Sequence, residues 1–109
     1  MRETYDKLVR DGIPELIRAD GDEPVTRVVE GEAYRERLQD KLDEEVAEFH
    51  ESGDVEELAD VLAVVDALAE ACGSSSTELA DIRRAKAAER GEFEEGVVLE
   101  SVRRSSGDE

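Results

Sequence analysis

Two runs of helical periodicity, separated by three residues, constrain the fold of this chain more than any other feature. The first run extends from about Glu32 to Glu51 and places on one helical face the residues Tyr34, Leu38, Leu42 and Phe49. The second run ends near Ala71. Between them lies Ser-Gly-Asp, in which Gly53 suits a helix C-cap and Asp54 an N-cap. A break this short predicts an antiparallel helical hairpin.

The second helix of this hairpin is apolar over an arc too wide for one neighbouring helix to cover. Its apolar residues are Leu58, Val61, Leu62, Val64, Val65, Leu68, Ala69 and Cys72. A surface helix needs an apolar stripe of only about 100°, so this arc predicts burial inside a bundle and against another subunit. We expect Cys72, the single cysteine, to be a packed core thiol. One cysteine permits no internal disulfide and indicates a reducing, cytoplasmic compartment.

The segments on either side of the hairpin predict two further helices. IPELIRAD, residues 13–20, forms a short helix that tolerates Pro14 in its first turn. Another helix begins in the serine-rich stretch after the hairpin, where Ser75 and Glu78 have the spacing of a capping box, and it ends near Gly91.

These elements together predict an all-α fold, an antiparallel bundle of about four helices. A short two-stranded β pairing is expected between the β-branched segments 25–29 and 97–102. We expect one domain over residues 1–102 and a disordered tail over 103–109.

The charge of the chain limits its partners. Its 31 acidic and 14 basic residues give a net charge of −17, which repels nucleic acid. No apolar run approaches the roughly 20 residues of a membrane span, so we expect neither nucleic acid nor membrane as a partner. Eleven Arg against three Lys resembles the usage of halophile proteins and predicts a fold that needs salt, because the Debye length falls to ~3 Å at 1 M.

Four carboxylates of the hairpin are predicted to converge. Glu45 completes the apolar stripe of the first long helix, where an unpaired charge costs several kcal/mol. Folding the helices about the Ser-Gly-Asp turn brings Glu48 level with Glu57, and Glu45 level with Asp60. A divalent cation among them would remove the repulsion. Glu44 points elsewhere on the helical wheel.

The alternative interpretation is an acidic, solvated coat, because carboxylate pairs at this spacing are common in so acidic a chain. If the cluster does bind a metal, its all-oxygen ligands favour Mg²⁺, with Mn²⁺ as the second candidate. A di-iron bundle requires Glu-x-x-His motifs, and the single histidine, His50, does not have that spacing. Mg²⁺ commonly bridges to substrate phosphates, which indicates phosphate chemistry.

Several basic residues are candidates for binding those phosphates, some of them from a neighbouring subunit. Lysine is rare in this chain, and its compact charge suits phosphate oxygens. The candidates are Lys7, Arg10, Lys41, Lys86 and Arg90. Ordinary surface positions are the competing interpretation.

The sequence resembles a known enzyme family in three places. EEVAE followed by ELAD is similar to the ExxE…ExxD signature of the all-α NTP pyrophosphatases, the superfamily of MazG, dimeric dUTPases and phosphoribosyl-ATP pyrophosphohydrolase. YDKLVRDGIPELI near the start and KAAERGEFEEGVVLESV near the end resemble a MazG-related branch of house-cleaning pyrophosphohydrolases. The resemblance covers about residues 4–102.

This resemblance implies a helical bundle that assembles as a homodimer or homotetramer. It implies Mg²⁺-dependent hydrolysis between the α and β phosphates of a nucleotide, which gives a monophosphate and pyrophosphate. The implied metal ligands are Glu45, Glu48, Glu57 and Asp60, with Glu45 and Glu48 also as catalytic residues. Two rival functions stay open: a phosphoribosyl-ATP pyrophosphohydrolase of histidine synthesis, and a non-catalytic acidic helical interaction module.

Overall fold

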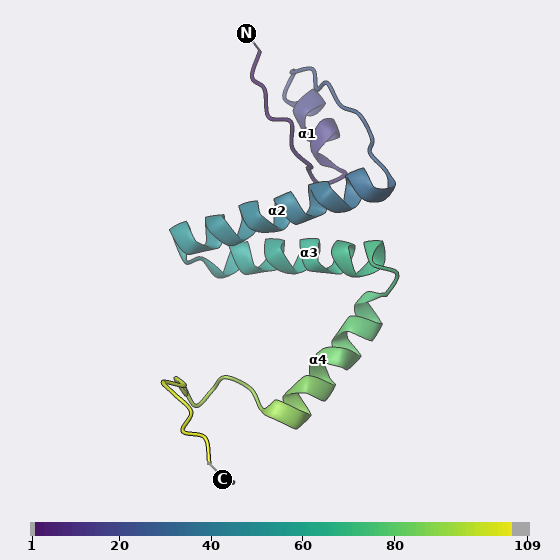
Figure 1. Ribbon diagram of the computed structural model, residues 1–109. Helices are drawn as coiled ribbons and strands as arrows, with labels where there is room; N and C mark the ends of the chain where they lie inside the picture. The colour runs from purple at the N-terminus through teal and green to yellow at the C-terminus, as the bar shows by residue number, and fades with distance from the viewer. Residues whose placement is uncertain (1, 106–109) are drawn as a thin grey trace.

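The described part of the chain is all-α, with four helices joined by loops (Figure 1). The computed structural model describes residues 2–105. Its helices are α1 (Ile13–Ala19), α2 (Gly31–Ser52), α3 (Val55–Ala71) and α4 (Ser76–Arg90). The predicted all-α fold of about four helices is therefore confirmed. The predicted domain boundary stays a prediction, and residues 106–109 of the predicted tail lie outside the described residues.

The antiparallel hairpin of α2 and α3 is the centre of the molecule (Figure 1). Gly53 ends α2 in the left-handed conformation, with φ 71°, and its N–H donates to the carbonyl of Phe49 at 2.7 Å. This conformation costs glycine little because it has no Cβ. Asp54 takes the predicted N-cap position of α3, but its side chain makes no capping bond; its N–H donates instead to Ser52 Oγ at 3.1 Å.

The start of α4 shows one half of the predicted capping box, because the Glu78 carboxylate accepts from Ser74 Oγ at 3.1 Å rather than from the N–H of Ser75. Ser75 Oγ accepts a hydrogen bond from the N–H of Glu78 at 3.1 Å. This bond satisfies one of the four free N–H groups at the helix start. From there α4 leaves the hairpin and carries the chain away from it (Figure 1).

The predicted β pairing of 25–29 with 97–102 is wrong. Neither segment is a strand, and no backbone hydrogen bond joins them in residues 2–105. Val28 and Val98 are 88% and 80% exposed. The direction of α4 explains the failure, because it places the second segment at the opposite end of the molecule from the first (Figure 1). Local β preference without a partner within reach does not make a strand.

The chain is long and thin, with little interior of its own. Its Cα radius of gyration is 19.9 Å, whereas a compact chain of this length has a radius of about 13 Å. Among the described residues only Leu38, Val64 and Glu45 are buried. The expected core position of Cys72 is wrong for the single chain, since this residue is exposed. No described helix has the length and apolar character that crossing a membrane requires.

Because the interior is so small, each of its apolar residues matters to stability. Leu38 is 3% exposed, and we expect Leu38→Ala to lower the free energy of unfolding by about 2–4 kcal/mol. Leu16 on α1 is 62% exposed and supplies the matched control. Urea unfolding followed by circular dichroism measures both variants. Equal losses from Leu38→Ala and Leu16→Ala would contradict the placement of the core between α2 and α3.

Candidate metal centre

The hairpin brings carboxylates from both helices to one level. One carboxylate oxygen from each of Glu45, Glu57 and Asp60 lies within 4.8 Å of the others. A second group with the same spacing is formed on α2 by Glu44, Glu45 and Glu48. Glu45 belongs to both groups and is buried, so it links the two helices' acids. Glu45 and Asp60, which were predicted to lie at one level, belong to the same group, whereas Glu48 and Glu57, the other predicted pair, belong to different groups.

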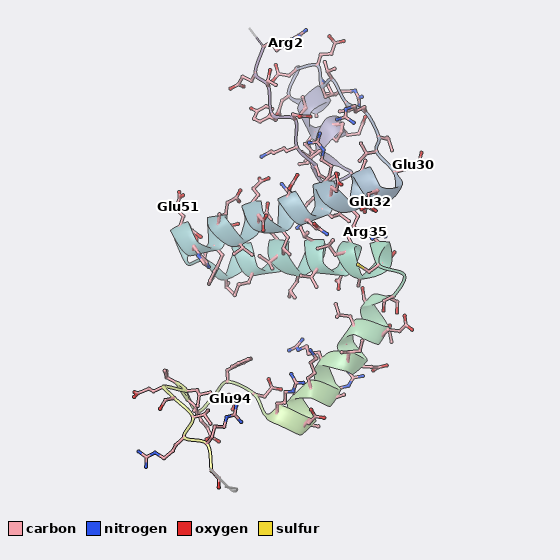
Figure 2. The ribbon with its side chains drawn as sticks, viewed as in Figure 1. Arg2, Glu30, Glu32, Arg35, Glu51 and Glu94 are labelled. Carbon is pink, nitrogen blue, oxygen red and sulfur yellow. The ribbon has the colours of Figure 1, made fainter. Side chains whose placement is uncertain are left out.

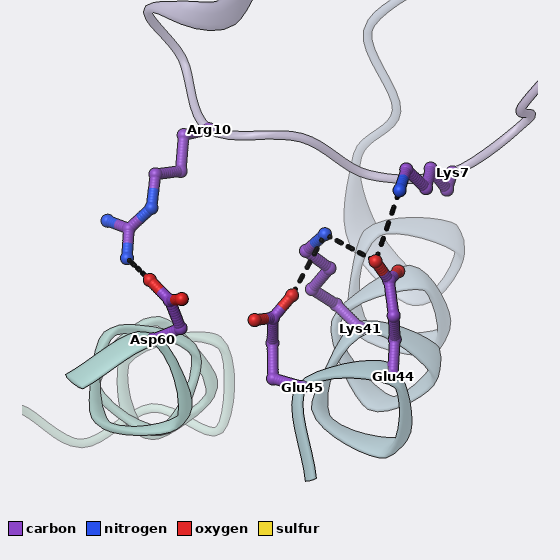
Figure 3. A network of polar contacts seen from close by, with 6 residues as sticks. All are labelled: Lys7, Arg10, Lys41, Glu44, Glu45 and Asp60. Carbon is purple, nitrogen blue, oxygen red and sulfur yellow. Dashed lines mark hydrogen bonds and ion pairs between the residues drawn. The ribbon is translucent and has the colours of Figure 1, made fainter. Parts of the chain in front are cut away.

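Glu45 is buried in contact with one cation of its own helix. Lys41 Nζ lies 3.2 Å from a Glu45 oxygen and 3.2 Å from Glu44 Oε2 (Figure 3). The side chains of Lys41 and Glu45 are 15% and 8% exposed. Screening by water is therefore weak, and this pair is held more strongly than a surface pair.

An irregular segment, residues 6–10, crosses over the carboxylates; we refer to it as the strap (Figure 3). Lys7 Nζ donates to Glu44 Oε2 at 3.1 Å, and Arg10 Nη2 donates to Asp60 Oδ1 at 2.7 Å. The strap thus contacts both α2 and α3. Arg10 and Lys7 are 60% and 42% exposed, and exposed pairs of this kind contribute roughly 0.2–1 kcal/mol each.

The strap is also tied to α2 at its first residue. Arg37 Nη1 donates to the backbone carbonyl of Asp6 at 2.7 Å, and Arg37 Nη2 lies 3.3 Å from the Asp6 carboxylate. Asp6 has a positive φ of 47°, a conformation that aspartate tolerates better than most residues. A cavity of about 60 Å³ lies between the strap and α2, lined by Asp6, Lys7, Leu8, Arg37, Asp40, Lys41 and Glu44.

Like charges and burial raise the pKa values of two carboxylates in the cluster, Glu48 and Glu57. The charge of Glu45, followed by burial, raises the pKa of Glu48. Burial, followed by the charges of Glu48 and Asp60, raises the pKa of Glu57. Both carboxylates therefore hold their protons more firmly than free glutamate, because burial and negative neighbours both disfavour the ionised form.

The pKa values of the two groups beside the strap, Glu44 and Lys41, shift so as to favour the charged form of each. Burial alone would raise the pKa of Glu44, but hydrogen bonds from Lys7 and Lys41 outweigh it and lower that pKa. Burial would lower the pKa of Lys41, but its bonds to Glu44 and Glu45 outweigh burial and raise it. Lys41 is thus a firmly charged ammonium, and the cluster divides into a neutralised part at Glu44 and a repelling part at Glu48 and Glu57.

The raised pKa values of Glu48 and Glu57 predict that the free energy of unfolding falls as the pH rises above the ordinary pKa of glutamate. Between the ordinary and the raised pKa values of Glu48 and Glu57, the folded state binds more protons than the unfolded state, so the unfolding free energy decreases with pH. Glu44 acts in the opposite direction at lower pH: its stabilising effect is lost as pH falls through its lowered pKa.

Thermal unfolding in EDTA from about pH 4 to about pH 7 measures this slope. We expect Glu57→Gln to flatten the slope and to raise the melting temperature at the upper end of the range. Glu56→Gln, an exposed neighbour on α3 outside the cluster, is the control and is expected to change neither. A Glu57→Gln protein that melts lower than wild type at neutral pH would contradict this electrostatic account.

The donor set fits a hard divalent cation. Every ligand atom offered by Glu45, Glu48, Glu57 and Asp60 is a carboxylate oxygen, the ligand type that Mg²⁺ and Mn²⁺ prefer. The repulsion that raises the pKa of Glu48, and that adds to the effect of burial on the pKa of Glu57, is the conflict that such a cation would relieve. The residues present therefore suit Mg²⁺.

Most of the residues predicted for the site come together, and two do not. The four acids lie in one region with Lys7, Arg10 and Lys41 (Figure 3). Lys86 and Arg90 are on α4, which runs away from the hairpin (Figure 1), and Arg90 pairs with its neighbour Glu89 at 3.4 Å.

Glu44 is the residue that the helical wheel misplaced. The structure puts its carboxylate beside Lys7 and Lys41, in a possible ligand group with Glu45 and Glu48. Its spacing of three residues from Lys41 was the available signal, since such neighbours meet on a helix surface.

Comparison with known proteins adds one partial match. A protein of Mycolicibacterium smegmatis, described as uncharacterized, is 60% identical over 43 residues. The match covers 39% of this chain and 44% of that protein, so the chain spans less than half the length of the curated relative. No protein-family model and no solved structure matches the chain.

Proposed function

We propose that this protein is a Mg²⁺-dependent nucleotide pyrophosphohydrolase with a house-cleaning role. The observation that carries the proposal is the convergence of Glu45, Glu57 and Asp60 from two helices, with one oxygen of each within 4.8 Å of the others and Glu45 buried. Acidic residues that only solvate the surface are expected to be exposed, and none of them would be buried where both helices contribute carboxylates. The resemblance to the all-α NTP pyrophosphatases supports the same function.

In this proposal Glu45, Glu48, Glu57 and Asp60 hold Mg²⁺, or Mn²⁺ in its place. The cation, when bound, neutralises phosphate charge and activates water for attack. Glu48 is the exposed member of the cluster, and its raised pKa makes it the better proton acceptor at neutral pH. Glu48 orients the attacking water and accepts a proton from it. The buried Glu45 sets the height along the hairpin at which the metal site lies.

The cations of the site bind the phosphates. Lys7 and Arg10 on the strap are exposed and face the cluster from above, while Lys41 is held by Glu44 and Glu45 from below (Figure 3). Water attacks the α phosphorus, the bond from that phosphorus to the bridging oxygen breaks, and pyrophosphate leaves with the bond's electrons. Charge from Lys7 and Arg10 stabilises the pyrophosphate as it forms.

The cavity beside the candidate metal centre is too small to enclose a nucleotide. The cavity beneath the strap is about 60 Å³, whereas ligand sites usually measure about 300–1,000 Å³. We therefore propose that the catalytic form is a homodimer or homotetramer, in which a neighbouring chain adds walls to the site. Lys86 and Arg90, which lie away from the cluster of their own chain, are then available to the site of another. A nucleotide substrate and a single cysteine favour the cytoplasm.

Pyrophosphate release from a panel of nucleotides tests the function. The panel contains canonical and damaged NTPs together with phosphoribosyl-ATP, assayed with Mg²⁺ or Mn²⁺ in molar KCl, because the charge of −17 predicts a fold that needs screening. We expect release of pyrophosphate and a monophosphate from NTPs. A clear preference for phosphoribosyl-ATP would assign the protein to histidine synthesis instead. No release from any nucleotide would favour a binding module.

A further inference from the structure

The strap is bonded to α2 at its first residue and to α3 at its last. Arg37 of α2, whose side chain is 27% exposed, donates to the Asp6 carbonyl at 2.7 Å. At the other end Arg10 donates to Asp60 at 2.7 Å (Figure 3). Among the polar contacts of residues 2–105, this pair is the one that joins the strap to α3. The polar attachment to α3 therefore depends on a single exposed ion pair.

The two carboxylates that hold the strap have different places in the candidate metal centre. Asp60 belongs, with Glu45 and Glu57, to the carboxylate group formed by both helices, which we call the two-helix group. Glu44 belongs to the group that lies on α2 alone. Arg10 thus bonds to a carboxylate that a cation in the two-helix group would need.

Arg10 and such a cation would compete for Asp60. A cation held by this carboxylate would lie about 2 Å from one of its oxygens, beside a guanidinium nitrogen that lies 2.7 Å from Oδ1. The Arg10 side chain is 60% exposed, and the stabilisation that an exposed pair provides is small compared with the repulsion of like charges so close together. The divalent cation would therefore displace the guanidinium rather than share the carboxylate with it.

The remaining contacts of the strap lie outside this competition. Lys7 bonds to Glu44, and Arg37 bonds to the strap backbone. None of these three residues belongs to the two-helix group. When the contact with α3 is lost, the strap is still tethered to α2, so Arg10 stays close to the cluster with its guanidinium free.

We propose that Arg10 exchanges partners: it pairs with Asp60 while the cluster is free of metal, and a divalent cation in the two-helix group releases it to bind the phosphates of the substrate. The strap then opens at α3 and stays fixed at α2. Metal binds before nucleotide, because the metal-bound site is the one that presents a free guanidinium. This inference rests on the metal centre of the proposed function and adds the order in which its ligands bind.

Arg10→Met tests the exchange through affinities, without any measurement of turnover. Because Mg²⁺ no longer has to displace a partner from Asp60, we expect the variant to bind Mg²⁺ roughly 2–5-fold more tightly than wild type. With the site saturated with Mg²⁺, we expect it to bind inorganic pyrophosphate about 10-fold more weakly, since a charge-assisted hydrogen bond to phosphate is lost. Isothermal titration calorimetry measures both affinities.

Arg18→Met is the matched control. Arg18 lies on α1 and pairs with Glu15 of the same helix, so its substitution makes the same change in net charge outside the cluster. We expect both affinities to remain those of wild type. If Arg18→Met tightens Mg²⁺ binding as much as Arg10→Met does, net charge alone sets the affinity, and the exchange of partners is refuted.

Trypsin, which cleaves after lysine and arginine, measures the opening of the strap. In wild type we expect cleavage after Arg10 to be at least about 3-fold faster in Mg²⁺ than in EDTA, because proteolysis follows the population of the open form. Cleavage after Arg37 and Lys41, both within α2, is the internal control and is expected not to accelerate. Mass spectrometry of the peptides identifies each cleavage site.

The ways in which the proposal can fail are distinct from one another. If wild type binds neither Mg²⁺ nor Mn²⁺, the metal centre of the proposed function is refuted, and this inference with it. If wild type binds Mg²⁺ but Arg10→Met binds it no more tightly, or if cleavage of the strap does not respond to Mg²⁺, the exchange is refuted and the metal centre stands. Unchanged pyrophosphate binding in Arg10→Met would also refute it. Weaker binding of both ligands would mean that Arg10 only supports the fold.

Discussion

Glu45→Gln is expected to lower Mg²⁺-dependent pyrophosphate release by at least about 100-fold, because loss of an outer-shell partner of a metal ligand alone costs about 10–100-fold. Glu45 belongs to both carboxylate groups and is 6% exposed, so this substitution removes the ligand that the two groups share. Glutamine keeps the size of the side chain and a carbonyl oxygen but removes the negative charge. Steady-state kinetics over a range of Mg²⁺ concentrations measures the loss.

Glu51→Gln provides the matched control for this result. Glu51 is an exposed residue near the end of α2 (Figure 2) that belongs to neither carboxylate group, and its variant is expected to keep the wild-type rate. Circular dichroism of both variants confirms that α2 is intact. If Glu45→Gln retains the wild-type rate at every Mg²⁺ concentration, Glu45 is not a ligand of a catalytic ion.

The hairpin and its buried acid were predictable because both follow from local geometry. Helical periodicity fixes which residues share a face, and the turn at Gly53 fixes which residues share a level. Those two facts suffice to place Glu45 on the apolar stripe and Asp60 opposite it. No knowledge of the rest of the chain was needed, and the structure agrees at each of these positions.

The strap could not be placed from the sequence. Its contacts join residues far apart in the chain: Lys7 and Glu44 are 37 residues apart, and Arg10 and Asp60 are 50 apart. An irregular segment has no periodicity to indicate which surface it crosses. The rarity of lysine suggested that Lys7 and Lys41 matter, but it gave no information on which carboxylate each would contact.

The failed β pairing has the same origin. Valine-rich segments predict strands only when a partner lies within reach, and here the direction of α4 separates segment 25–29 from segment 97–102 (Figure 1). That direction is set by a few residues after Ala71, where no periodic signal operates. The misplacement of Cys72 is related, because a wide apolar arc indicates burial without indicating which chain provides the cover.

Lys41→Met is expected to lower the free energy of unfolding by about 2–4 kcal/mol in the absence of divalent cations, because removing one partner leaves a buried charge uncompensated. Methionine keeps most of the length and apolar surface of lysine, so the loss reports the charge. Lys41 Nζ lies 3.2 Å from oxygens of both Glu44 and Glu45. Lys86→Met on α4 is the control, since none of the described carboxylates lies within ion-pair distance of Lys86, and its change is expected to be within about 0.5 kcal/mol.

Adding Mg²⁺ to the Lys41→Met protein distinguishes a specific metal centre from an acidic surface that only solvates the chain. If Glu45, Glu57 and Asp60 bind the cation, the ion replaces the missing ammonium beside Glu45, and stability recovers by RT ln(1 + [Mg²⁺]/Kd). Urea unfolding at increasing MgCl₂, with NaCl of equal ionic strength as the reference, measures this recovery. A specific site gives a saturating gain that Glu57→Gln reduces, because that substitution removes a ligand from α3. A gain that NaCl reproduces at equal ionic strength would show only screening of the charge of −17, and the metal centre would be refuted without any assay of activity.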